Sequence, residues 1–407
     1  MTNIQPSAAA APTAAGIAVP TPHEGTALVL LSLAYFTVGV TSLEVVGVLG
    51  PMGHDLEVTP GAAAGLVTAF ALAFAVAAPL AQALATRWTL PTLLVGGLVL
   101  LAAGCVGTAL AGDYPTALGL RIACGAAAAL VGPSASAVGA ALVPAHRRGR
   151  ALGTVFAGAT LATVVGVPLA TWLGSHLSWR TVFLLVAALA LAIALAVRLR
   201  VPGHVGAGRA RLGLAEVATL MGRRAVGSSI LASLLQMVAQ FVTYALLGAL
   251  MAERFGSDAD QVSLALFVFG VAGMAGNALA ARMADGIGVN AATRLSFGGM
   301  ALSFVALIAA PGYAWSLAAL AGWAAFSLML MTPQQKRLVM LAGDRTAVAL
   351  GLNSSAIYVG IALGSSLGGG AYGLFGGPAL PLLSLAVTAA AALAAEWAMR
   401  APDARRL

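Results

Sequence analysis

The sequence predicts an all-α integral membrane protein whose twelve transmembrane helices form two six-helix halves related by a pseudo-twofold axis. Of its 407 residues, 60% are hydrophobic and only 8% are charged, whereas soluble domains average roughly 25% charged residues. Twelve apolar windows are long enough to cross roughly 30 Å of hydrocarbon. An internal repeat relates the first six windows to the last six. A soluble globule is therefore excluded.

The apolar windows divide the chain into two halves joined by a basic segment. The first six spans lie near 26–49, 61–84, 91–111, 115–143, 149–173 and 179–199. The last six lie near 225–251, 259–283, 290–310, 314–335, 347–374 and 378–399. The segment between them is arginine- and glycine-rich, a composition that cannot insert into a bilayer and predicts a cytoplasmic linker. We therefore expect a disordered cytoplasmic tail at 1–25, an N-terminal half at 26–199, a linker at 200–224, a C-terminal half at 225–400 and a cytoplasmic tail at 401–407.

The basic residues predict which side of the membrane each loop faces. If the N-terminus is cytoplasmic, 18 of the 21 Lys and Arg residues fall in cytoplasmic segments, whereas only Arg180 and Arg254 lie outside and Arg121 lies within a span. Such an excess of basic residues is typical of cytoplasmic loops. Because the number of spans is even, both termini and the linker are expected in the cytoplasm.

The internal repeat joins equivalent spans of the two halves. Gln82–Arg87 matches Asn277–Arg282 at an offset of 195 residues, and Ala151–Gly153 matches Ala349–Gly351 at an offset of 198. An offset of six spans preserves the direction of the chain across the membrane. Two parallel repeats of this kind are a transporter architecture, with the binding site near the midplane between the halves.

One full charge, Glu44, lies within the first span. Thr37, Thr41 and Glu44 are spaced i, i+4 and i+7, which places all three on one helical face. An ionisable side chain within a span costs roughly 2.5 to 3.5 kcal/mol and normally faces a cavity or a partner. The alternative is an acid close enough to the helix end to reach headgroup water.

Arg121 is the only charge in the span from Pro115 to Pro144. At 1.5 Å per residue, Glu44 is about 8 Å and Arg121 about 9 Å from the outer ends of their spans. Opposite charges at one depth predict an ion pair or a water-bridged couple. The alternative is that Arg121 snorkels outward or only ties helices together.

A second polar stripe in span 7 corresponds to the first. At an offset of 199, Thr37 and Thr41 align with Gln236 and Gln240, and Tyr244 continues that face. Such side chains can simply bond across helices. Two symmetry-related stripes instead favour a shared aqueous substrate cavity.

Two runs of small residues follow the i+4 spacing of a helix face. Span 5 carries Gly158, Ala162, Gly166, Ala170 and Gly174, interrupted off this face by Pro168, and span 11 carries Ala356, Gly360, Gly364 and Gly368. Small residues let two helices approach closely. We expect both stripes to pack across the interface between the halves.

Several of these segments resemble the major facilitator superfamily. Leu118–Gly125 is similar to its span 4 motif, an Arg followed four residues later by Gly, and the stripe with Gly166-Val-Pro168 is similar to its span 5 antiporter motif. Trp179-Arg180 and Asn353–Gly370 resemble the twelve-span drug and sugar efflux branch, which includes the drug:proton antiporter-1 and arabinose-efflux-permease groups. The resemblance covers about residues 26–400. It implies the superfamily fold, a bacterial inner (plasma) membrane and proton coupling through Glu44 and Arg121.

The chain departs from the family pattern in two places, the loop after span 2 and Cys124. The loop motif after span 2 lacks both its acid and its basic run over Gln82–Pro91, whereas the second half keeps Asp285 within Met283–Gly288. The resemblance therefore implies a gating contact at Asp285 and puts the first half's gating contacts in doubt. Cys124 stands where Gln is commoner, which weakens the polar contact of the span 4 motif.

The expected function is proton-driven export of a small organic compound, such as a drug, a sugar or an amino-acid derivative. Uptake is the runner-up, and the antiporter motif favours export. A membrane-embedded enzyme needs a nucleophile with a base or paired acids, but the histidines fall in or beside loops and no second buried acid accompanies Glu44. A channel is a third possibility. We expect no ATP, because a phosphate-binding loop is missing. We also expect no cofactor, no metal and no nucleic-acid partner, and a monomer in the lipid bilayer.

Overall fold

The computed structural model describes residues 22–84, 88–203 and 219–401. Within these ranges the regular structure is helical, and twelve segments are long and apolar enough to cross a membrane. The predicted fold class is therefore confirmed. Residues 1–21 of the tail expected at 1–25 lie outside the described residues, as do most of the linker and the end of the C-terminal tail.

The first six spans form the N-terminal half. They comprise α1 (Pro22–Asp55), α2 (Pro60–Ala63) with α3 (Gly65–Leu84), α4 (Leu90–Leu110), α5 (Tyr114–Ala141), α6 (Arg148–Leu161) with α7 (Val167–His176), and α8 (Trp179–Arg200). A short 3-10 turn, Ala145–Arg147, precedes α6. A π-helical segment, Ala162–Gly166, joins α6 to α7, and such segments are frequent at functional positions in helices.

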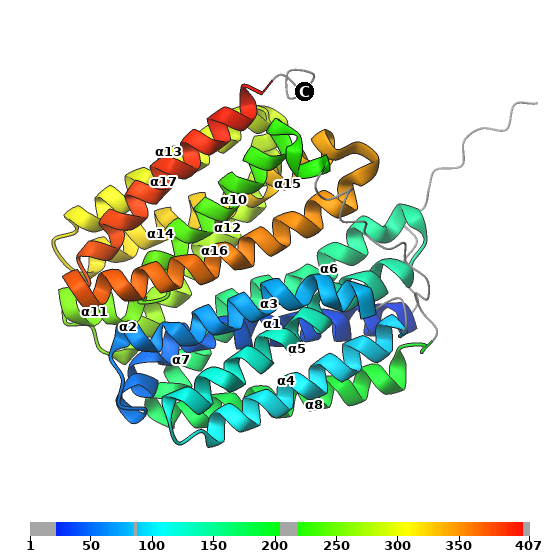
Figure 1. The fold of residues 1–407 in the computed structure, drawn as a ribbon, viewed down its shortest axis with the longest axis horizontal. Coiled ribbons are helices and arrows are strands. Elements are labelled where there is room, and N and C mark those ends of the chain that lie inside the picture. The colour runs from blue at the N-terminus through cyan, green and yellow to red at the C-terminus, as the bar shows by residue number, and fades with distance from the viewer. Residues whose placement is uncertain (1–21, 85–87, 204–218, 402–407) are drawn as a thin grey trace, which may run out of the picture.

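The last six spans form the C-terminal half. They comprise α10 (Arg224–Tyr244), α12 (Ala259–Gly286), α13 (Val289–Ala309), α14 (Tyr313–Met329) with α15 (Met331–Ala342), α16 (Thr346–Phe375) and α17 (Ala379–Met399). The window expected at 225–251 is interrupted after Tyr244, and a separate helix, α11 (Leu247–Phe255), continues the chain. Figure 1 shows the two halves as separate bundles, with α2, α7 and α11 at the end away from the chain's C-terminus.

Two seams join the halves. In the first, α3 lies beside α16: Ser365 Oγ donates to Ala64 O at 2.8 Å, and the rings of Phe74 and Tyr358 stack with centroids 3.6 Å apart. In the second, α12 crosses the π-helical segment and α7: Ser263 Oγ donates to Pro168 O at 2.8 Å. At the crossing, a Cβ on Gly270 would lie 2.6 Å from Val164 Cα, so the two backbones are in close contact there.

The small-residue stripes pack within each half. A Cβ on Gly158 would collide with Ser32 O of α1, and a Cβ on Gly364 would lie 2.6 Å from Val238 O of α10. The expectation that the stripes pack across the interface between the halves is therefore wrong. A sequence pattern identifies a small face but not the helix that covers it. The internal repeat still holds, because α1 and α10 are equivalent first spans of their halves.

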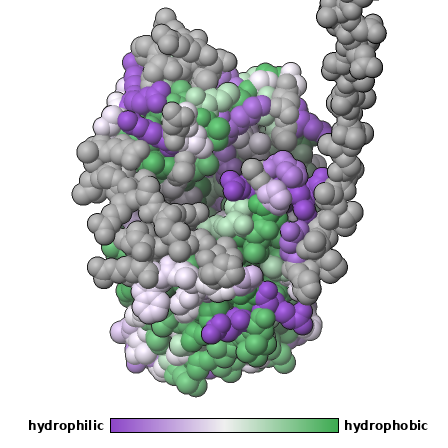
Figure 2. All heavy atoms as spheres, turned by 90° about the vertical axis from the view of Figure 1, so that its right-hand side faces the viewer, coloured by the Kyte–Doolittle hydropathy of each residue, from purple (hydrophilic) through white to green (hydrophobic). Residues whose placement is uncertain are grey.

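The two ends of the molecule differ in their polar residues. The linker end is the end at which Arg200 and Arg224 lie, and Figure 2 shows patches of hydrophilic residues there beside hydrophobic ones. At the opposite end, here called the far end, Asp55 accepts hydrogen bonds from Trp179 Nε1 at 3.0 Å and from Arg180. Arg180 also donates to Ala111 O at 3.1 Å, so one arginine ties together the ends of α1, α4 and α8.

Candidate functional site

Glu44 and Arg121 meet inside the N-terminal half. Arg121 Nη1 lies 3.7 Å from Glu44 Oε1, and both side chains are 0% exposed. The contact expected from their equal depth is therefore present. Neither carboxylate oxygen of Glu44 nor Nη1 of Arg121 has a hydrogen-bond partner among the described residues. The pair is thus held by charge attraction, and each charge depends on the other for compensation in a buried site.

Arg121 is fixed by three further groups. Its Nη2 donates to Thr41 O at 2.9 Å and its Nε donates to Leu66 O at 3.5 Å. The guanidinium carbon also lies 4.6 Å from the centroid of the Phe70 ring, a distance at which a cation is attracted to the face of an aromatic ring. Arg121 therefore connects α5 to both α1 and α3. Among the described residues, Arg121 is the only charged contact of Glu44.

The polar face of α1 points into its own half. Thr37 and Thr41 are fully buried, and their hydroxyls donate to Leu33 O at 2.9 Å and to Thr37 O at 2.8 Å. Such bonds to the carbonyl one turn earlier satisfy a hydroxyl without a cavity. A cavity-lining role for either threonine would therefore require water to enter the N-terminal half.

The matching stripe in α10 forms a small polar network. Gln236 Nε2 donates to Ser327 Oγ at 2.8 Å and to Gln240 Oε1 at 3.3 Å, and Ser327 Oγ also contacts Gln240 Oε1. Tyr244 is buried in an aromatic cluster, with its ring centroid 4.8 Å from that of Phe269. The structure thus brings Gln236 and Gln240 together but separates them from the polar face of α1.

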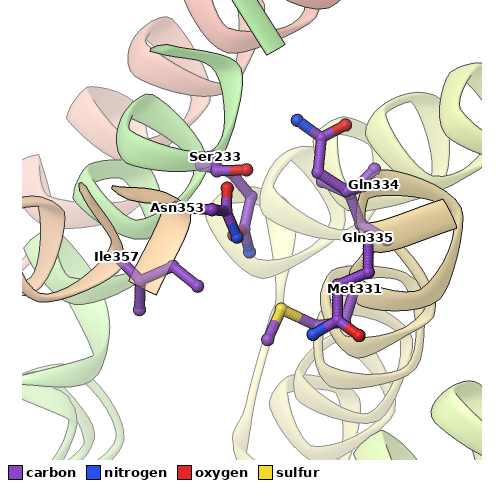
Figure 3. Close-up of a pocket in the computed structure, with 8 residues that line it drawn as sticks. Ser233, Met331, Gln334, Gln335, Asn353 and Ile357 are labelled. Atoms are coloured by element: carbon purple, nitrogen blue, oxygen red, sulfur yellow. The ribbon is translucent and has the colours of Figure 1, made fainter. Parts of the chain in front are cut away.

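A small polar cavity lies in the C-terminal half beside Gln236. Its volume is about 10 Å³, which is close to the room that one water molecule needs. Figure 3 shows Asn353 of α16 facing Gln334 and Gln335 of α15 across it. Asn353 Oδ1 is buried without a hydrogen-bond partner among the described residues. The sequence analysis missed this group, although amide side chains within the apolar spans 10 and 11 were the signal that could have revealed it.

Cys124, which departs from the family pattern, and Asp285, which keeps it, have different outcomes. Cys124 and Cys105 are both buried, and a Cβ on Gly104 of α4 would lie 2.5 Å from Cys124 Sγ. The thiol of Cys124 therefore packs between α5 and α4. The side chain of Asp285 lies outside the described residues, so its expected gating contact is not described.

Comparisons with known proteins identify relatives along most of the chain. The family model described as Major Facilitator Superfamily matches residues 27–227 and 229–407. The inner membrane transport protein YdhP of Escherichia coli O157:H7 is 30% identical over 346 residues, which is 84% of this chain and 87% of YdhP. A chloramphenicol resistance protein of Streptomyces lividans is 33% identical over 265 residues, 63% of this chain and 66% of that protein.

A solved structure supports the same fold. The crystal structure of a D-xylose-proton symporter superposes with a TM-score of 0.76 and 18% sequence identity, covering 94% of this chain and 99% of the symporter. At this identity the similarity concerns the arrangement of helices. Both kinds of comparison agree with twelve spans in two halves.

Proposed function

Because this chain belongs to the major facilitator superfamily, we propose that it exports a small organic compound in exchange for protons, by alternating access between its two halves. It is a multi-pass membrane transporter and not an enzyme. The observation that carries the proposal is the pair formed by Glu44 and Arg121, because an acid and a base buried within a membrane span are costly and typical of proton pathways.

Proton coupling would work through the dependence of each charge on the other. When Glu44 is ionised, it compensates the charge of Arg121 at 3.7 Å. When Glu44 takes up a proton, that attraction is lost, while Arg121 keeps its bonds to the carbonyls of Thr41 in α1 and Leu66 in α3. The relative stability of the helix arrangements around Arg121 then changes with protonation. If the substrate prefers one arrangement, proton and substrate affect each other's affinity reciprocally.

The proposed substrate is a neutral or weakly charged molecule of mixed polarity. Gln236, Gln240 and Ser327 offer amide and hydroxyl groups without a charge, and such groups suit hydroxyl- or amide-bearing compounds. The relative from Streptomyces lividans is named for chloramphenicol resistance. We therefore propose an amphenicol as the first compound to test, followed by sugars and amino-acid derivatives.

The other residues identified in the sequence take supporting roles in this proposal. Thr37, Thr41 and Tyr244 would border the substrate path in a more hydrated conformation. The glycine stripes would hold α6–α7 on α1 and α16 on α10 as the halves move, with Pro168 at the seam to α12. Asp285 would act at the gating loop. The protein would function as a monomer in a bacterial inner membrane, with both termini in the cytoplasm.

The test uses purified full-length protein in liposomes with radiolabelled chloramphenicol and an imposed pH gradient. Uphill movement should require the gradient, and dissipation of the gradient should abolish it. Glu44→Gln should lose uphill movement, and any downhill movement that survives should not depend on pH. Glu57→Gln, which changes an exposed acid after α1, should behave like the wild type.

The direction of coupling separates export from uptake. Antiport predicts that substrate and protons move in opposite directions, whereas uptake with protons predicts the same direction, as followed by a pH-sensitive dye inside the liposomes. Uphill transport by Glu44→Gln with the wild-type pH profile would show that Glu44 is not the proton site.

A further inference from the structure

A cluster of arginines surrounds the end of α17 at the linker end of the molecule. Arg224 begins α10, Arg294 lies in the second turn of α13, and Arg400 directly follows α17. Figure 1 shows α17 beside α10 and α13, so three helices each place one cation at the same part of the surface. The three arginines lie at or near the ends of their spans, where a membrane protein meets the lipid headgroups.

One acid lies among these arginines, and Arg294 already engages it. Glu396 of α17 accepts from Arg294 Nε and also from Arg294 Nη2 at 3.0 Å, so this ion pair is bidentate. Arg400 Nε lies 3.9 Å from Glu396 Oε2, which is beyond hydrogen-bond distance, and the Arg400 side chain is 79% exposed. Among the described residues no other acid forms an ion pair with the three arginines. Three cations against one anion leave a surplus of two positive charges.

Arg224 is held in an exposed position by an aromatic ring. Its Cζ lies 4.8 Å from the centroid of the Trp397 ring, a distance at which a cation is attracted to the face of the ring. In the part of the chain that the structure describes, its guanidinium forms no hydrogen bond or ion pair. The N–H groups of Arg224 therefore remain available to an anion. Trp397 is itself 53% exposed, and tryptophan at the end of a span is typical of the headgroup level.

A fourth arginine adds positive potential from beneath the cluster. Arg337 of α15 donates to Asn290 Oδ1 at 2.7 Å, on α13 one turn before Arg294. The residue is 2% exposed, and among the described residues it has no acidic partner and its Nη1 has no hydrogen-bond partner. A buried charge is screened by salt less than an exposed one. Arg337 therefore strengthens the attraction of the surface for anions, although it is too deeply buried to touch a ligand.

Toward the membrane centre, the exposed face of α17 is lined by alanine. Ala386, Ala389 and Ala390 are exposed, and we call them the alanine strip. At 3.6 residues per turn, these three positions, Trp397 and Arg400 all lie within about 100° of one another around the helix. The alanine strip therefore leads along one face of α17 to the arginine cluster.

Larger apolar side chains lie level with the alanine strip on the neighbouring helices. The ion pair with α13 and the ring contact with α10 fix the levels of both helices against α17, which runs antiparallel to them. Counted from these contacts, Leu302 of α13 and Leu231 of α10 lie level with the alanine strip. Leu302 is 68% exposed and Leu231 is 42% exposed. Low side chains on α17 beside taller ones on its neighbours suit contact with an extended acyl chain.

We propose that this surface binds an anionic glycerophospholipid of the leaflet at the linker end, with its phosphate between Arg224 and Arg400 and one acyl chain along the alanine strip. Clusters of Lys and Arg beside a span attract anionic lipids. A soluble phosphate would use the arginines but not the alanine strip. The site lies on the C-terminal half, whereas Glu44 lies in the N-terminal half, and it requires neither substrate nor proton coupling.

The equivalent helix of the N-terminal half lacks this combination. α8 ends at Arg200 and also carries Arg198, so it presents two exposed cations at the same end of the molecule. Its exposed face carries leucines, including Leu191, Leu195 and Leu199, instead of an alanine strip. A comparison of the two helices therefore separates binding at a specific site from the general attraction of basic residues to an anionic membrane.

The test measures binding of the first lipid to the delipidated full-length protein in detergent micelles by native mass spectrometry. The probe is dioleoylphosphatidylglycerol, and dioleoylphosphatidylcholine, which has the same chains and no net charge, reports chain contact alone. Arg224→Gln/Arg400→Gln should raise the Kd of the phosphatidylglycerol about tenfold and leave that of the phosphatidylcholine within twofold. The matched control Arg198→Gln/Arg200→Gln should leave both values within twofold.

A second comparison tests contact with the acyl chain. Ala390→Trp fills the alanine strip from its exposed side, and it should raise the Kd of the phosphatidylglycerol at least threefold. Leu195→Trp, on the exposed face of α8, should leave it within twofold. Inorganic phosphate at the same concentration as the lipid should not displace the lipid. Displacement by inorganic phosphate, or equal Kd values of the two lipids for the wild type, would overturn the proposal.

A third measurement locates the bound lipid. A phosphatidylglycerol with a diazirine in one acyl chain, photolysed on the full-length protein, should label peptides from α17 at least fivefold more than peptides from α8. Arg224→Gln/Arg400→Gln should abolish this preference, and an excess of unlabelled phosphatidylglycerol should compete where phosphatidylcholine does not. Equal labelling of α8 and α17 in the wild type would show that the lipid is held by general attraction and would contradict the proposed site.

Discussion

Substitutions of Arg121 test whether the buried charge pair behaves as the structure indicates. Arg121→Met keeps an unbranched side chain but removes the charge, and it leaves the carboxylate of Glu44 buried without a counter-charge. Removal of one partner of a buried pair costs roughly 3 to 5 kcal/mol. Arg121→Lys keeps the charge, but one ammonium cannot replace the guanidinium that contacts Glu44 and also donates to Thr41 O at 2.9 Å. The loss of one charged hydrogen bond costs roughly 1.5 to 3 kcal/mol.

The double variant Glu44→Gln/Arg121→Met distinguishes charge compensation from packing. Because it removes both charges together, it should recover most of the stability that Arg121→Met alone loses. Unfolding in mixed detergent micelles, at matched protein concentration, should rank the free energies of unfolding as wild type, then Arg121→Lys, then Arg121→Met. Uphill transport by Arg121→Lys, Arg121→Met and the double variant should in each case fall below that of the wild type. A double variant no more stable than Arg121→Met would refute the reasoning, because Arg121 would then stabilise the half through its packing on Phe70 and its carbonyl contacts.

Three further predictions concern packing, pH and topology. Gly364→Leu should strongly impair folding or transport, because even a Cβ at this position would lie 2.6 Å from Val238 O. The control, Leu195→Ala on the exposed face of α8, should have little effect. Protein yield and transport are measured for both variants. Hydrogen bonds from the Thr116 N–H and hydroxyl lower the pKa of Asp113 below its usual 3.8. The ionised Asp113 should therefore stabilise α5 fully above pH 3.8, and this stabilisation should be lost as the pH falls through the lowered pKa of the folded state. Asp113→Asn should remove this pH dependence from acid unfolding. A reporter active only outside the cytoplasm should be inactive when fused after Leu407, and activity would contradict the cytoplasmic C-terminus.

The fold could be predicted from the sequence because it depends on the length and hydropathy of the spans and on the internal repeat. A span must satisfy its own backbone hydrogen bonds in lipid, so an apolar window of about 20 residues predicts a helix with little help from tertiary context. The breaks inside the windows were missed. The interruption after Tyr244 and the π-helical segment at Ala162–Gly166 carry no change in hydropathy that would reveal them.

The site could be predicted only in part from the sequence, for a related reason. Depth along a span follows from counting residues, and it correctly brought Glu44 level with Arg121. The direction of a helix face depends on which neighbours surround the helix, and the sequence does not specify them. The face of Glu44 therefore could not be assigned to the interior of the N-terminal half, nor could Gly158 be assigned to contact with α1 rather than with the other half.

The internal repeat also shows which residue of the C-terminal half stands at the position of Glu44. At the offset of 199 residues, Glu44 corresponds to Thr243, whose hydroxyl shares a hydrogen bond of 2.7 Å with Ser384 Oγ. The residue at the position of Glu44 in the C-terminal half is thus a neutral hydroxyl, and it bonds to α17 rather than to α14, the helix equivalent to the α5 that carries Arg121. Neither Thr243 nor Ser384 can take up a proton near neutral pH. Conversion of Thr243 to an acid would bury a charge with no arginine opposite. A buried ion pair in the C-terminal half would therefore also need a second substitution on a facing helix.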